Sequence, residues 1–146
     1  MVSAVGAWAL GMMASTPSAC VAAAAGQLLD DLALARAVSM EGKQVAHIIV
    51  FDPGTLSYHV APVSAPDQPI ERPNGSLCRE RFASGRLAAV HMQVASMGGD
   101  NRVGFGGFGQ LDQGDDAVIG LALEDALAQI RIAARTGEAS LLEMTR

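Results

Sequence analysis

The spacing of apolar residues predicts one long helix in the first third of the chain. Ser18 provides an N-cap and Gly42 a stop signal, so we expect the helix to lie between them. Apolar positions recur there at intervals of three and four residues, as on one face of a helix: Val21, Ala25, Leu28, Leu32 and Ala35.

A β-hairpin is predicted from residues 45 to 63. Two apolar runs rich in β-branched residues flank Asp52-Pro53-Gly54-Thr55, a sequence typical of a tight turn. A two-residue turn at its centre places His47 across from Val60. Because side chains alternate between the faces of a sheet, His47 and His59 should then point to opposite faces and cannot share a metal.

The remaining segments are predicted as helices and one more strand. Residues 3–13 fit a buried first helix, and residues 76–97 fit a helix that begins at a serine cap and ends at a glycine pair. Residues 102–110 fit a glycine-rich strand. The apolar stripe of residues 119–134 predicts a last helix, although Ala117 to Leu123 fits a strand leading into a shorter helix equally well.

Together these elements predict a single α+β domain spanning residues 1–146. Its sheet would be small and mainly antiparallel, built from the hairpin 45–63 and the glycine-rich strand 102–110. Three or four helices would pack on this sheet to form a two-layer sandwich. A chain of 146 residues is long enough to bury a core of this kind.

The composition narrows the classes of protein. Half of the residues are hydrophobic and 17% are charged, which excludes disorder over most of the length. A net charge of -5 argues against nucleic-acid binding, which normally needs a basic surface. Lys43 is the only lysine among the 10 cationic residues, and this preference for arginine over lysine indicates a GC-rich bacterial gene.

The N-terminal segment allows two locations for the protein. No charged side chain precedes Asp30, so residues 1–17 form either an apolar N-terminal helix or a targeting segment. Pro17 interrupts the apolar run, which argues against an integral membrane span. Since two cysteines make no disulfide framework, we expect a cytoplasmic protein, with export through the apolar N-terminal segment as the alternative.

Two cysteines are candidate nucleophiles. Cys20 lies two residues after the predicted cap at Ser18, where the positive end of the helix dipole would favour a thiolate. His47 and Asp52 would then complete a hydrolase-like triad, although strand alternation turns these two side chains to opposite faces. Cys78 follows Ser76 at the same spacing. The structural alternative is a small buried cysteine at both positions.

Two further groups of residues are candidate binding sites. Arg79, Arg81 and Arg86 would surround the start of the helix at 76–97 and could bind an anion, unless they form only a solvated basic surface. Gly104 and Gly106 share one strand face and would leave a smooth patch for a helix, a partner or a flat ligand. We expect neither a cofactor nor a metal, because no histidine pair has metal-ligand spacing.

Three segments of the sequence are similar to known families. Residues 49–56, together with 103–107 and 115–118, resemble small haem-binding proteins with a profilin-like α/β fold and roadblock-type dimerisation modules. Where the haem-binding family has a double glycine, this chain has Pro53-Gly54. We therefore assign no family and carry over no functional residue.

The sequence favours a non-catalytic α+β module that binds a protein partner or a small ligand and self-associates. The high apolar fraction, the uncharged N-terminal segment and the smooth glycine strand all predict surfaces that must be covered. The alternative is a thiol-dependent hydrolase, deamidase or transferase that uses Cys20 or Cys78 with a histidine base.

Overall fold

The fold consists of one long helix packed against two antiparallel sheets. The computed structural model describes residues 16–41, 46–52, 57–81, 91–94 and 101–145. Helix α2 spans Pro17–Glu41. In the first sheet the strands follow the order β3 (Arg79–Arg81), β2 (Ser57–Pro62), β1 (His47–Asp52) and β5 (Arg102–Phe105). In the second sheet the order is β4 (His91–Val94), β6 (Ala117–Leu123), β7 (Ala126–Ile132) and β8 (Ala139–Thr145).

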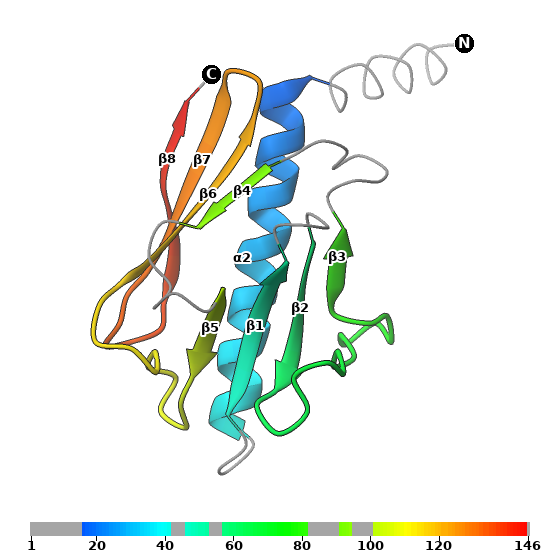
Figure 1. Cartoon of the computed structure of the whole chain (residues 1–146), viewed down its shortest axis with the longest axis vertical. Helices are drawn as coiled ribbons and strands as arrows, with labels where there is room; N and C mark the ends of the chain where they lie inside the picture. The colour runs from blue at the N-terminus through cyan, green and yellow to red at the C-terminus, as the bar shows by residue number, and fades with distance from the viewer. Residues whose placement is uncertain (1–15, 42–45, 53–56, 82–90, 95–100, 146) are drawn as a thin grey trace.

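Helix α2 runs along the middle of the molecule, with β6, β7 and β8 to its left and β2 and β3 to its right (Figure 1). The helix contacts strands of both sheets and so joins them through one core. Each large apolar side chain fully buried there contributes roughly 1.5–3 kcal/mol. The largest of these in the strands are Tyr58, Phe105, Ile49, Ile119, Leu121, Ile130 and Ile132.

The predicted helix in the first third of the chain is confirmed, with a different cap. The side chain of Thr16 caps it, because its Oγ1 accepts the main-chain N–H of Ala19 at 3.3 Å. Pro17 is then the first helical residue, a position at which proline loses no hydrogen bond. The buried face keeps the expected spacing of three and four residues, through Val21, Ala24, Ala25, Leu28, Asp31, Leu32, Ala35 and Ser39.

The hairpin is present, but its register differs from the predicted one. His47 pairs with Pro62, and His59 pairs with Val50. The pairing is shifted by two residues relative to the prediction. Four residues, 53–56, lie between the two strands, whereas the predicted turn had two. A shift by two restores the same faces, so the two histidines still lie on opposite faces of the sheet.

The prediction of a single sheet covered by three or four helices is wrong. The described part of residues 76–97 contains the strands β3 and β4, and the segment 119–134 forms the hairpin of β6 and β7 in place of a helix. Glu124 makes the reversal with a left-handed φ of 53°. The strand interpretation of Ala117–Leu123 agrees with β6, although another strand follows it. The first helix predicted at residues 3–13 lies outside the described residues.

Candidate functional site

The predicted triad of Cys20, His47 and Asp52 is not assembled. Cys20 is buried in the first turn of α2, whereas the main-chain nitrogen of His47 lies 3.0 Å from Ser39 Oγ, near the other end of this helix. The helix rises roughly 28 Å between Cys20 and Ser39. His47 and Asp52 lie at opposite ends of β1. A nucleophilic role for Cys20 stays a prediction.

Cys78 belongs to a buried polar cluster that centres on Asp31 of α2. Asp31 is 2% exposed. Its Oδ2 accepts hydrogen bonds from the Tyr58 hydroxyl at 2.6 Å, from Arg72 Nη2 at 3.0 Å and from Gln27 Nε2 at 3.2 Å. Its Oδ1 accepts from Arg72 Nε at 3.1 Å and from the Cys78 thiol at 3.3 Å. The cluster therefore joins the helix, β2 and the loop before β3.

The electrostatics of this cluster keep Asp31 ionised and the thiol protonated. Burial opposes the charge on Asp31, but hydrogen bonds from Arg72 and Tyr58 outweigh it and lower the pKa of this carboxyl. Burial and the neighbouring Asp31 carboxylate raise the pKa of Cys78 to about 12. The sequence predicted a thiolate, and so a lowered pKa, because it placed Cys78 at a helix start. The pKa is raised instead, since Cys78 lies just before a strand.

The predicted arginine site is also built differently. Arg79 and Arg81 lie on the exposed side of the short edge strand β3, and no helix begins beside them in the described part of the chain. Glu80 between them turns the other way, and its Oε1 accepts from Arg72 Nη2 at 3.0 Å. Arg86 lies outside the described residues. Binding of an anion by Arg79 and Arg81 stays a prediction.

Residues of the chain itself cover the predicted glycine patch. Strand β5 ends at Phe105, and the chain then folds back. A side chain at Gly104 would overlap the carboxylate of Asp112, and one at Gly106 would lie within 2.6 Å of the amide of Gln110. The absence of a side chain at these two glycines therefore leaves room for the following loop of the same chain. Whether they also bind a partner or ligand stays a prediction.

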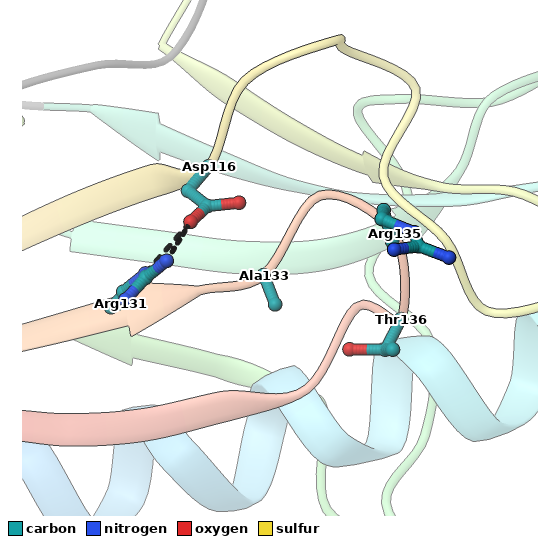
Figure 2. Close-up of a pocket in the computed structure, with 5 residues that line it drawn as sticks. All are labelled: Asp116, Arg131, Ala133, Arg135 and Thr136. Atoms are coloured by element: carbon teal, nitrogen blue, oxygen red, sulfur yellow. Dashed lines mark hydrogen bonds and ion pairs between the residues drawn. The ribbon is translucent and has the colours of Figure 1, made fainter.

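A hollow of about 500 Å³ lies beside the turn between β7 and β8. Asp116, Arg131, Ala133, Arg135 and Thr136 line it, as Figure 2 shows. Oδ2 of Asp116 accepts hydrogen bonds from Arg131 Nε and Nη2, and its Oδ1 accepts the main-chain N–H of Ala134 at 2.7 Å. The hydrogen bond from Ala134, followed by that from Arg131, lowers the pKa of Asp116. The ion pair therefore persists at neutral pH.

The outer face of α2 is a surface that the sequence analysis did not identify. We use this name for the exposed residues Ala22, Ala23, Gly26, Asp30, Ala33, Ala37, Met40 and Glu41. Only Asp30 and Glu41 among them are charged, whereas the solvent face of a helix is normally polar. The recurrence of alanine and glycine at helical spacing, at Ala22, Gly26, Ala33 and Ala37, was the available signal.

Two further properties concern membranes and metals. Within the described residues, α2 is long and apolar enough to cross a membrane, which qualifies the expectation of no membrane span, although 44% of its most apolar window is buried in the protein. Such a result is also typical of core helices and signal sequences. In the same residues no cluster of three histidine, cysteine, aspartate or glutamate side chains could hold a metal. The expected absence of a cofactor stays a prediction.

Comparison with known proteins shows the fold. No protein-family model and no curated protein sequence matches the chain. The minor pseudopilin EpsH from the type 2 secretion system of Vibrio cholerae superposes with a TM-score of 0.63 at 11% identity, over 84% of this chain and 95% of that one. The type IV minor pilin FimU of Pseudomonas aeruginosa superposes with a TM-score of 0.59 at 14% identity, over 84% and 88%. The chain therefore has a pseudopilin-like fold.

Proposed function

We propose that this chain is a pilin-like subunit that acts by assembling with other protein subunits and has no catalytic role. The observation that carries the proposal is the outer face of α2, on which five of eight residues are alanine or glycine, in a fold similar to minor pilins and pseudopilins. The expected binding module is thereby narrowed to an assembly subunit.

The small size of these residues suits helix packing. Ala22, Gly26, Ala33 and Ala37 leave the backbone of α2 accessible along its length, so a second helix can approach closely. Larger apolar side chains would bury more surface but would hold the two helices further apart. We therefore expect the partner element to be a helix of a neighbouring subunit.

The proposal changes the expected location of the protein. The two solved structures to which it is similar are described as parts of a secretion system and of a pilus. Together with the apolar α2, this favours the exported alternative over the cytoplasmic location. Fractionation of the native host should then recover the chain with the membrane or outside the cytoplasm.

Crosslinking of cysteine variants tests the assembly. Ala33→Cys places a thiol on the outer face of α2, and Asp67→Cys places one on an exposed loop as the control. The native Cys20 and Cys78 are buried and contribute little background. A short bismaleimide added to intact cells should join Ala33→Cys to a second subunit and leave Asp67→Cys monomeric.

The proposal is wrong if Ala33→Cys stays monomeric at native expression while its thiol remains open to a small maleimide. Equal crosslinking of both variants would also count against it, because collision would then explain the products. Ala33→Glu provides a second measure. It should abolish co-purification of neighbouring subunits while changing the free energy of unfolding by less than about 0.5 kcal/mol.

A further inference from the structure

The hollow at the turn between β7 and β8 is the second feature of the molecule that the fold alone does not explain. Asp116 and Arg131 lie on one side of Ala133, and Arg135 and Thr136 lie on the other (Figure 2). The chain carries a net charge of -5, yet two guanidiniums and one carboxylate meet here. We infer that this hollow is a binding site for a carboxylate.

The charges of the lining leave one cation for a ligand. Both carboxylate oxygens of Asp116 are occupied, by Arg131 and by the main-chain N–H of Ala134. Asp116 therefore neutralises Arg131, whereas Arg135 makes no ion pair with any residue that the structure describes. One net positive charge on a planar guanidinium matches a single carboxylate, which can accept two parallel hydrogen bonds from it.

Thr136 supplies a second donor. Its Oγ1 accepts the main-chain N–H of Glu138 at 3.2 Å, so the hydroxyl proton is left to donate to a ligand. Arg131, on the other side of Ala133, contacts Asp116 through Nε and Nη2, and its Nη1 donates to no residue that the structure describes. The hollow thus offers several donors, and Asp116, its only acidic side chain, is already paired.

The turn that carries these donors is held in place from two directions. Arg36 of α2 donates from Nε to the main-chain oxygen of Thr136 at 2.7 Å. On the other side, Gly137 packs so closely on the carbonyl of Gly109 that no side chain would fit. A turn whose main chain is fixed before the ligand arrives loses little backbone entropy on binding.

A polypeptide partner and a small free acid could both supply the carboxylate. Leu141 and Leu142 lie further along β8, the strand that follows this turn, and are exposed apolar residues that a polypeptide could also contact. Affinity for acetate alone therefore measures the carboxylate site, and any gain from a peptide measures the contribution of a protein partner. This inference is independent of the proposed assembly through α2.

Nuclear magnetic resonance of the arginine Nε–H groups in the full chain tests the site. Sodium acetate, an acetylated leucyl-glutamate amide and its leucyl-glutamine counterpart are titrated at constant ionic strength. We expect acetate and the glutamate peptide to shift the Arg135 signal saturably, and the glutamine peptide to leave it unchanged. Tighter binding of the glutamate peptide than of acetate identifies a protein partner as the source, and equal binding identifies a small acid.

Variants fix the location of the site. Arg135→Gln, followed through the Arg131 Nε–H signal, should weaken acetate binding roughly two- to fivefold, and Arg135→Glu should abolish it. Arg102→Gln removes an exposed arginine of the other sheet and should change nothing. The inference is overturned if the Arg135 signal moves no more than that of Arg102, or if all exposed arginines respond alike. Neither result would bear on crosslinking through α2.

Discussion

Arg72 binds Asp31 through two parallel hydrogen bonds, from Nε at 3.1 Å and from Nη2 at 3.0 Å. The two residues are 41 positions apart, so this ion pair fastens the loop before β3 to the middle of α2. The side chain of Asp31 is 3% exposed and that of Arg72 is 15% exposed. The Asp31 hydrogen bonds are the first reason why the pKa of Arg72 is raised, so the pair stays charged.

Removing the charge of Asp31 should destabilise the fold. Asp31→Asn keeps the size of the side chain but leaves Arg72 partly buried without its carboxylate, and we expect the free energy of unfolding to fall by about 3 kcal/mol. Urea unfolding followed by circular dichroism measures the loss. Asp30→Asn is the matched control, because Asp30 is the exposed neighbour and its replacement should change stability by less than about 0.5 kcal/mol.

The same carboxylate makes stability depend on pH. The folded-state pKa of Asp31 lies below its ordinary value of 3.8, so the unfolded chain binds the proton more readily. The contribution is fully present above about pH 4 and is lost as the pH falls through the folded pKa. The stability gap between the native chain and Asp31→Asn should therefore be large at about pH 7 and shrink as the pH falls below 3.8 and through the folded pKa. A gap that stays constant in acid would contradict this assignment.

Cys78 should be inert towards alkylation in the folded protein. With a pKa of about 12, its thiolate fraction at neutral pH is roughly a thousandfold below that of a free cysteine, and the side chain is fully buried. Iodoacetamide labelling followed by peptide mass mapping should find Cys78 unmodified in buffer and modified in concentrated urea. Labelling at the rate of a free thiol in buffer would revive the thiol-enzyme alternative.

The sequence predicted the elements whose signals are local. Helix α2 has its periodic face within 25 residues, and the hairpin of β1 and β2 has the sequence Asp52-Pro53-Gly54-Thr55 between two apolar runs. The hairpin of β6 and β7 had no such mark. Its reversal at Glu124 and Asp125 contains neither glycine nor proline, so the apolar spacing across it satisfied a helix as well as two strands.

The candidate sites were harder to predict because they depend on distant contacts. The spacing of Asp31 from Leu28 and Ala35 places it on the buried face of α2, but its partners could not be predicted. Tyr58, Arg72 and Cys78 lie 27, 41 and 47 residues away. The side chains around the hollow come from both ends of the β6–β7 hairpin and from the following turn. Their meeting follows from a strand pairing that the sequence did not predict.

Gly137 should not tolerate a larger residue, because its turn lies in close contact with the turn that contains Gly109. Its φ is 72°, and an added Cβ would overlap the carbonyl oxygen of Gly109. Gly137→Ala should therefore lower the free energy of unfolding by about 3 kcal/mol, since it combines backbone strain with a displaced turn. Thermal unfolding measures this loss. Gly114→Ala is the control, because nothing lies within 4 Å of its added Cβ, and it should be nearly neutral.

Two substitutions of Gly26 distinguish the stability of α2 from its proposed role in assembly. The residue is exposed in mid-helix, and an added Cβ meets nothing within 4 Å, so Gly26→Ala should raise the free energy of unfolding by about 0.5–1 kcal/mol. Gly26→Leu should also fold well, but its side chain would hold a neighbouring helix away from α2. Thermal unfolding measures the first effect, and crosslinking through Ala33→Cys in the Gly26→Leu background measures the second. Stable folding with unchanged crosslinking would show that the outer face of α2 does not pack closely against a second helix.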